Sequence, residues 1–181
     1  MSPAIELFQS SPLFFLTTVF ILGLIIGSFL NVVILRLPRM MQADWKQQCC
    51  ELLEIEDNSK QFNKFNLVTP RSHCPVCHHQ ISTLENIPII SFLILRGKCK
   101  KCGTSISIRY PAIELLSGIV AVVVAFYFGV SLQTVFAILL SWALIALSVI
   151  DIDHQLLPDD ITLPFMWLGI IVNYFNLFTS L

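Results

Sequence analysis

The chain has 181 residues, of which 55% are hydrophobic and only 13% are charged. Ordinary soluble domains carry about a quarter charged residues, so this composition excludes a typical soluble globular protein. The formal net charge of −1 gives no reason to expect a nucleic-acid partner. Charge-free runs cover residues 7–35, 115–150 and 161–181, and most charged side chains lie between the first two runs. This segregation predicts an all-α protein that crosses a lipid bilayer about four times.

The first predicted membrane-spanning helix covers residues 12–36. Its polar side chains are small apart from Asn31, and its length suits one tilted crossing of about 30 Å of hydrocarbon. A cleaved signal peptide is the alternative, but signal peptides have a basic start, and no Lys or Arg precedes Arg36. We therefore expect a retained span.

A large polar loop, residues 37–110, follows this span. All eleven Lys and Arg residues lie within residues 36–109, and the positive-inside rule places such a loop in the cytoplasm and the N-terminus outside. Topology thus explains the basic loop without a nucleic-acid role. Within it, the stretch from Asp44 to Phe65 could form a short amphipathic helix.

Four of the six cysteines form two CxxC pairs in this loop, Cys74-Pro-Val-Cys77 and Cys99-Lys-Lys-Cys102. In a reducing cytoplasm these thiols do not settle as disulfides, and four thiolates suit a tetrahedral Zn²⁺. The sequence predicts a structural zinc site rather than a catalytic one, because a closed four-thiolate shell leaves no open position for water.

Other side chains near the cysteine pairs offer alternatives. A redox pair of the thioredoxin kind would need only one CxxC and a βαβ pattern, which is missing here. Cys49 and Cys50 are adjacent and cannot easily face one metal together. A neighbouring imidazole could replace a thiolate; the candidates are His73, His78 and His79.

The charge-free run 115–150 is too long for one crossing, because a helix of that length would measure about 54 Å at about 1.5 Å per residue. It must fold back, and the segment from Gly129 to Ser131 is the expected turn. The predicted elements after the loop are spans at residues 111–129 and 132–150, an acidic cytoplasmic segment at 151–160, and a fourth span at 161–179.

The acidic segment 151–160 abuts the end of a predicted span. Asp151 follows Ser-Val-Ile directly, so its carboxylate is expected at the membrane boundary, where ionisable groups are costly and often functional. A solvated interfacial loop is the alternative. Two carboxylates held close together divide into an acid and a base, the arrangement that activates water in aspartic proteases. Asp151 is therefore a candidate catalytic residue.

The chain resembles the bacterial type IV prepilin peptidases, which combine leader peptidase and N-methyltransferase activities. The resemblance covers the whole chain. The segments that carry it, besides the two CxxC pairs, are Gly27-Ser-Phe-Leu-Asn-Val-Val33, Arg36-Leu-Pro38, Glu85-Asn-Ile-Pro88, Arg109-Tyr-Pro111 with Glu114, and Asp151-Ile-Asp-His-Gln-Leu-Leu-Pro-Asp159.

This resemblance implies a multi-pass enzyme of the bacterial inner membrane with a periplasmic N-terminus. Its implied substrates are prepilins and pseudopilins of pilus biogenesis and type II secretion, cleaved on the cytoplasmic side, after which the new N-terminus is methylated by S-adenosylmethionine. Asp151 is implied to be one half of a catalytic aspartate pair. The sequence shows no glycine-rich nucleotide loop for the methyl donor.

The chain departs from the family pattern at the other half of that pair. The family places the second aspartate in a Gly-x-Gly-Asp motif beside a later span, and none of the seven glycines here is followed within three positions by Asp. We therefore expect the N-terminal portion of a longer enzyme, inactive by itself. Asp153 and Asp159 are poor substitutes, because a dyad needs carboxylates from two elements held face to face.

Two nearby side chains allow more than one role. His154 could act as an acid or base, or could only hydrogen bond at the interface. Glu114 could be functional or could pair with Arg109 one turn earlier.

Two other functional classes compete with the peptidase. One is a non-catalytic membrane scaffold whose zinc loop docks partners, which the missing aspartate favours. The other is a zinc-dependent membrane hydrolase, which the absence of an HExxH pair disfavours.

Overall fold

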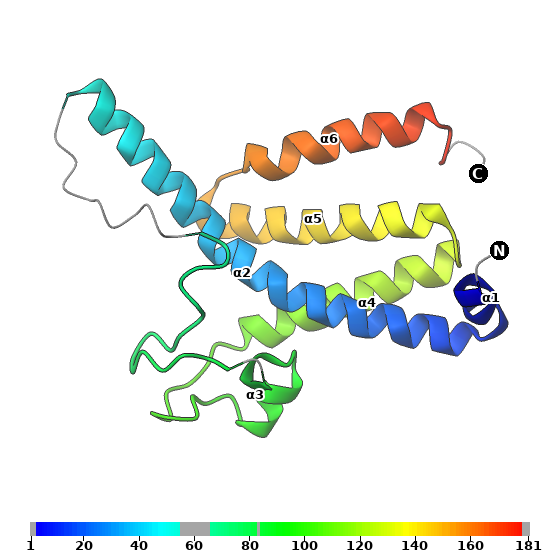
Figure 1. Cartoon of the computed structure of the whole chain (residues 1–181), viewed down its shortest axis with the longest axis horizontal. Coiled ribbons are helices and arrows are strands. Elements are labelled where there is room, and N and C mark those ends of the chain that lie inside the picture. Colours follow the sequence, from blue (N-terminus) through cyan, green and yellow to red (C-terminus); the bar gives the residue numbers. More distant parts are fainter. Residues whose placement is uncertain (1–2, 55–65, 83, 179–181) are drawn as a thin grey trace.

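The computed structural model describes residues 3–54, 66–82 and 84–178. These residues form helices joined by loops, with two isolated β-bridges and no extended strand among them. In chain order the helices are α1 (Pro3–Ser10), α2 (Pro12–Leu52), the 3-10 turn η2 (Leu84–Asn86), α3 (Ile90–Ile94), α4 (Arg109–Phe128), α5 (Leu132–His154) and α6 (Asp159–Tyr174) (Figure 1).

Three helices are long and apolar enough to cross a membrane, namely α2, α4 and α5, with mean hydropathies of 2.5, 2.0 and 2.4 over their most apolar windows. The predicted class, an all-α membrane protein, is confirmed. Helix α6 has 16 residues and would measure about 24 Å at about 1.5 Å per residue. It is not among the three, so a fourth crossing by residues 161–179 stays a prediction.

Helix α2 continues well beyond residue 36, where the first span was expected to end. It has 41 residues and passes through Pro38 without breaking, and its C-terminal part projects past the ends of α4 and α5 (Figure 1). The expected helix from Asp44 to Phe65 is continuous with α2 as far as Leu52; residues 55–65 lie outside the described part of the chain. The depth at which α2 leaves the bilayer stays a prediction.

Small residues allow α2 and α4 to pack backbone against backbone. A Cβ atom added to Gly23 would lie 2.7 Å from the Cα of Gly118, and one added to Gly27 would lie 2.7 Å from the Cα of Glu114. Ser117 is fully buried in the same contact. Membrane helices associate through such small residues, because lipid offers no hydrophobic force to drive them together. This explains the glycine that opens the Gly27-Ser-Phe-Leu-Asn segment.

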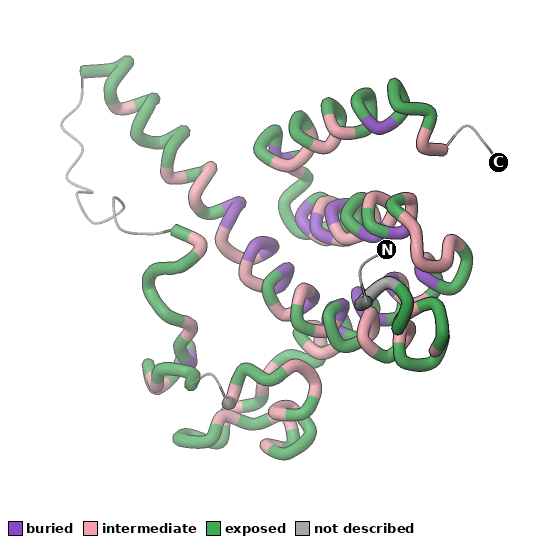
Figure 2. Tube along the Cα trace, turned by 45° about the vertical axis from the view of Figure 1, so that its right-hand side comes forward, coloured by how far each residue is buried: buried purple, intermediate pink, exposed green. Residues whose placement is uncertain are grey.

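Helix α5 turns back from α4 at residues 129–131, the segment expected to turn. Gly129 has φ +62°, which favours glycine, and the Ser131 hydroxyl accepts a hydrogen bond from the Thr134 backbone N–H at 3.2 Å. The indole of Trp142 donates to the Ser117 carbonyl at 3.2 Å and ties α5 to α4. The buried residues of α2, α4 and α5 pack together in the bundle, and the remaining positions of these helices are partly or fully exposed (Figure 2).

Candidate active site and metal centre

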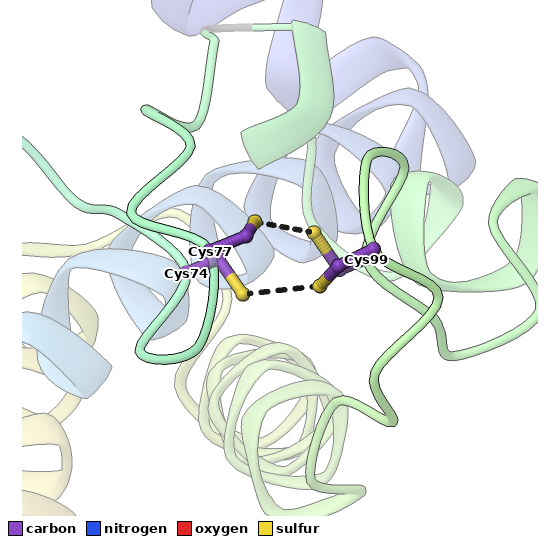
Figure 3. A group of neighbouring side chains, drawn as sticks. Cys74, Cys77 and Cys99 are labelled. Carbon is purple, nitrogen blue, oxygen red and sulfur yellow. Dashed lines mark hydrogen bonds between the residues drawn. The ribbon is translucent and has the colours of Figure 1, made fainter.

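The four cysteines of the two CxxC pairs meet in space. Their sulfur atoms all lie within 4.8 Å of one another, with Cys74 Sγ 3.7 Å from Cys102 Sγ and Cys77 Sγ 3.9 Å from Cys99 Sγ (Figure 3). Four thiolates at about 2.3 Å from a tetrahedral Zn²⁺ would be about 3.8 Å apart. The donor set and its spacing therefore fit zinc, and within the described residues no other group of three or more His, Cys, Asp or Glu side chains could hold a metal.

The two knuckles share one backbone design. In the first, the N–H of Cys74 donates to the His79 carbonyl at 2.9 Å; in the second, the N–H of Cys99 donates to the Thr104 carbonyl at 2.8 Å. The residue after the second cysteine has a positive φ in both, +54° at His78 and +72° at Gly103. His78 thus occupies the turn position rather than a ligand position.

The thiols of Cys77 and Cys102 differ in pKa. The Thr104 hydroxyl and backbone lower the pKa of Cys102 to about 6 through hydrogen bonds to its sulfur. The pKa of Cys77 is raised to about 11: the His79 backbone N–H acts to lower it, but burial and the three neighbouring thiols together outweigh that effect. Four thiolates this close repel one another, so the fully ionised cluster needs a cation at its centre.

Glu85 links the two knuckles from the outside. Its carboxylate accepts the Ser82 backbone N–H at 2.9 Å and lies 3.5 Å from both His79 Nε2 on the first knuckle and Lys100 Nζ on the second. The Ser82 hydrogen bond is the main cause that lowers the Glu85 pKa, and the nearby Lys100 ammonium group lowers it further. His79 is therefore a partner of a carboxylate, and its side chain is not drawn into the four-sulfur group.

Two side chains of α2 hold the chain at the two ends of the cysteine loop. The Arg36 guanidinium on α2 donates to the carbonyls of Asn66 and Pro70, at 2.8 and 2.6 Å, where the chain enters the first knuckle. The Asn31 amide donates to the Tyr110 carbonyl at 3.1 Å, where the chain enters α4. Both side chains belong to segments that carried the resemblance, but sequence reasoning did not find their roles, because each partner is a backbone atom 30 or more residues away.

Glu114 is buried on α4, and its Oε2 accepts the Ile89 backbone N–H at 2.8 Å. The pairing of Glu114 with Arg109, one of two alternatives that the sequence left open, is not formed. Arg109 lies at the start of α4 and turns toward α5, where its guanidinium forms an ion pair with Asp153. Glu114 is instead a third tie between the bundle and the cysteine loop. Its partner in the loop, Ile89, has a φ of +59°.

Asp151 lies in the last turn of α5 and not in a loop. It directly follows Ile150, which is completely buried, while its own side chain is exposed. Among the described residues, no side-chain hydrogen bond or ion pair engages its carboxylate. His154 ends the helix, and Asp159 begins α6 after a short link. The structure thus places the Asp151 carboxylate free at the end of the bundle from which α2 projects.

The Arg109–Asp153 pair connects two elements near the end of α5 that carries Asp151. Arg109 is the first residue of α4 after the second knuckle, and Asp153 is two residues beyond Asp151 on α5. The pair therefore joins the exit of the zinc loop to the helix end that carries Asp151. Sequence reasoning treated Asp153 as a solvated neighbour; the signal that pointed to it was the isolated basic residue at the start of a span.

These features define a class: a multi-pass helical membrane protein with four clustered cysteines that could hold a metal ion, and with an acidic end on its third long helix. Comparison with known families agrees. The bacterial peptidase A24 N-terminal domain matches residues 21–128, and the type IV leader peptidase family matches residues 138–181. The chain therefore belongs to the bacterial peptidase A24, or type IV leader peptidase, family.

Several curated relatives carry the name prepilin leader peptidase/N-methyltransferase. The protein of Stutzerimonas stutzeri is 53% identical over 181 residues, which are 100% of this chain and 62% of the relative. The protein of Pseudomonas aeruginosa is 48% identical over 99% of this chain and 61% of its own length. That of Legionella pneumophila is 45% identical over 94% and 59%. The chain thus spans about three fifths of these relatives, and no solved structure matches it.

Proposed function

We propose that this chain contributes the zinc-stabilised loop and the first catalytic carboxylate of a membrane aspartic endopeptidase that cleaves the leader of type IV prepilins and pseudopilins. The observation that supports this most directly is the exposed Asp151 carboxylate at the end of α5, within the part that matches the type IV leader peptidase family. The names of the relatives supply the substrate class.

Asp151 would act as one member of a pair that shares a proton. One carboxylate takes a proton from water as the water attacks the scissile carbonyl, and the other, protonated, hydrogen bonds to the carbonyl oxygen. The partner would be an aspartate outside these 181 residues, since Gly-x-Gly-Asp does not occur here. The relatives are longer than this chain, which leaves room for that partner.

The proposed role of zinc is structural. Cys74, Cys77, Cys99 and Cys102 would hold the ion, which supplies the positive charge that four close thiolates need. The ties from Arg36, Asn31 and Glu114 would then set the folded loop against the bundle. The relatives' names also include N-methyltransferase, so we propose S-adenosylmethionine as a second substrate of the complete enzyme.

The proposed membrane is the bacterial inner membrane, with the zinc loop and the end of α5 on the cytoplasmic side. This orientation is supported by the eleven Lys and Arg residues, all within residues 36–109. It would set Asp151 on the side where a basic prepilin leader is found before cleavage.

Replacement of Asp151 by Asn in the complete enzyme tests the proposal. The change is isosteric and removes the charge, so leader cleavage should fall by at least about a thousandfold while zinc content and membrane insertion are unchanged. Cleavage is measured as the gel shift of prepilin to pilin in membranes. Asp160→Asn, an exposed carboxylate in the first turn of α6, is the matched control and should stay near wild type.

Efficient processing by the Asp151→Asn enzyme would remove this residue from the mechanism. Processing by residues 1–181 alone would show that the partner carboxylate lies within this chain.

A further inference from the structure

Helix α3 presents an uncovered apolar face. Its side chains at positions i, i+3 and i+4 are Ile90, Leu93 and Ile94, which share one side of a helix and are 54%, 68% and 75% exposed. Phe92 points the other way and packs on Gly97, where an added Cβ would lie 2.9 Å from its ring. The fold of the loop therefore does not bury this face, and its side chains are not part of the core of the loop.

A fourth exposed apolar side chain follows where the chain returns toward α3. The Ile106 N–H donates to the Gly97 carbonyl at 2.7 Å, which returns the chain beside the end of α3. Ile108 follows, 76% exposed, immediately before the first residue of α4. We name these four residues the interfacial patch: Ile90, Leu93, Ile94 and Ile108.

The position of α3 along the bundle indicates what covers the patch. Glu114 accepts the Ile89 N–H, so α3 begins beside Glu114. Glu114 lies five residues into α4, about 7.5 Å along the helix at about 1.5 Å per residue. Helix α4 is one of the three helices fit to cross the bilayer, so the hydrogen bond from Ile89 to Glu114 ties the start of α3 to the first part of that helix (Figure 1). The patch is thus at the depth where α4 enters the membrane.

Charge near the patch complements a lipid surface. The residues that follow α3 include Arg96, Lys98 and Lys101, all exposed. A short segment with apolar side chains on one face and basic residues beside them is typical of elements that lie in the membrane interface and meet anionic headgroups. The start of α4, to which α3 is tied, also exposes apolar side chains: Leu116 is 45% exposed.

We propose that α3 and Ile108 are embedded in the cytoplasmic lipid interface, so that the zinc loop is a membrane-seated module and not a domain free in the cytoplasm. The bilayer is the occupant of the patch, and anionic headgroups contact the basic residues next to it. This placement adds a lipid contact to the three polar ties from the bundle. It concerns the position of the loop and does not depend on peptidase activity.

Fluorescence quenching by brominated lipid tests the proposal on the full chain in vesicles of phosphatidylcholine and phosphatidylglycerol. The acyl chains carry bromine in their upper half. The background carries Trp45→Phe and Trp167→Phe and keeps Trp142, whose indole bonds to α4; its constant signal is subtracted. Leu93→Trp is the test variant, Leu116→Trp on α4 is the lipid-facing reference, and Val76→Trp, 62% exposed on the first knuckle, is the aqueous reference.

The expected result is a blue-shifted emission at position 93 and a loss of intensity in brominated vesicles similar to that at position 116. Quenching no greater than at position 76 would overturn the proposal, as would an emission at position 93 that shifts only when a prepilin is added. Zinc content equal to that of the background reports folding of each variant. If Leu93→Trp loses zinc, Ile90→Trp gives the same measurement from the same face.

Discussion

At the scale of single residues, the two cysteine knuckles form the same turn with different residues after the second cysteine. Gly103 takes a positive φ at no steric cost, whereas His78 carries a Cβ into the same region, which costs a residue with a side chain about 1–2 kcal/mol. The first knuckle therefore stores strain that must be offset by other contacts. The next residue, His79, makes two contacts that help to hold the turn: its carbonyl accepts the Cys74 N–H, and its ring lies near the Glu85 carboxylate.

Removal of one sulfur should release the metal. We expect Cys99→Ser to lose stoichiometric zinc and to make the loop sensitive to proteolysis, because metal binding contributes folding free energy directly. Elemental analysis of the purified protein measures the metal. Cys49→Ser is the matched control, since Cys49 is exposed near the end of α2 and outside the four-sulfur group. Unchanged zinc in the Cys99→Ser protein would contradict the proposed centre.

At the scale of helices, backbone contact between α2 and α4 organises the bundle. We expect Gly27→Ala to destabilise the protein by about 1–3 kcal/mol, because the new Cβ meets the Glu114 Cα and the backbones must separate. Gly169→Ala is the matched control: nothing lies within 4 Å of its added Cβ, so the change should be neutral or stabilise α6 by up to about 1 kcal/mol.

Thermal unfolding in detergent micelles compares these two glycine variants. A Gly27→Ala protein as stable as the wild type would show that the helices do not approach as closely as described.

The ion pair between α4 and α5 should position the end of α5 without taking part in chemistry. In the complete enzyme we expect Arg109→Gln and Asp153→Asn each to lower the cleavage rate by no more than about fivefold, since partly exposed pairs contribute about 0–1 kcal/mol. The double variant should be no slower than the slower single variant, and the exchanged pair Arg109→Asp with Asp153→Arg should recover part of the rate.

Initial rates of prepilin cleavage by the wild type, the two single variants and the double variant form a double-mutant cycle. Effects of the two single changes that simply add would show that the residues act independently.

At the scale of the whole molecule, topology decides whether the carboxylate and the zinc loop face the same compartment. We expect a phosphatase reporter to be inactive when joined near residue 70 and active when joined near Ser131, because basic loops stay in the cytoplasm and the turn between α4 and α5 is then outside. Enzyme activity of the two fusions in intact cells measures it. The reverse pattern would separate Asp151 from cytoplasmic leaders and contradict the proposed function.

Sequence by itself determined the class of this protein, since length and apolarity of a segment decide whether it can cross a bilayer, and ligand spacing decides whether thiolates can share an ion. It therefore predicted the helical membrane fold and the cysteine group. It placed Asp151 in a segment after the span, whereas the residue lies in the last turn of α5. The number of crossings stays a prediction, because α6 is shorter than the apolar run that suggested a fourth span.

Only the tertiary structure decided which distant groups meet. The partners of Arg109 and Glu114 lie 44 and 25 residues away, and no local period or spacing encodes such contacts. Likewise, the start of α3 is held at Glu114 of α4 by one hydrogen bond from a backbone N–H, a group that every residue except proline carries. Local physics sets the elements, but their mutual positions depend on packing that only the folded chain reveals.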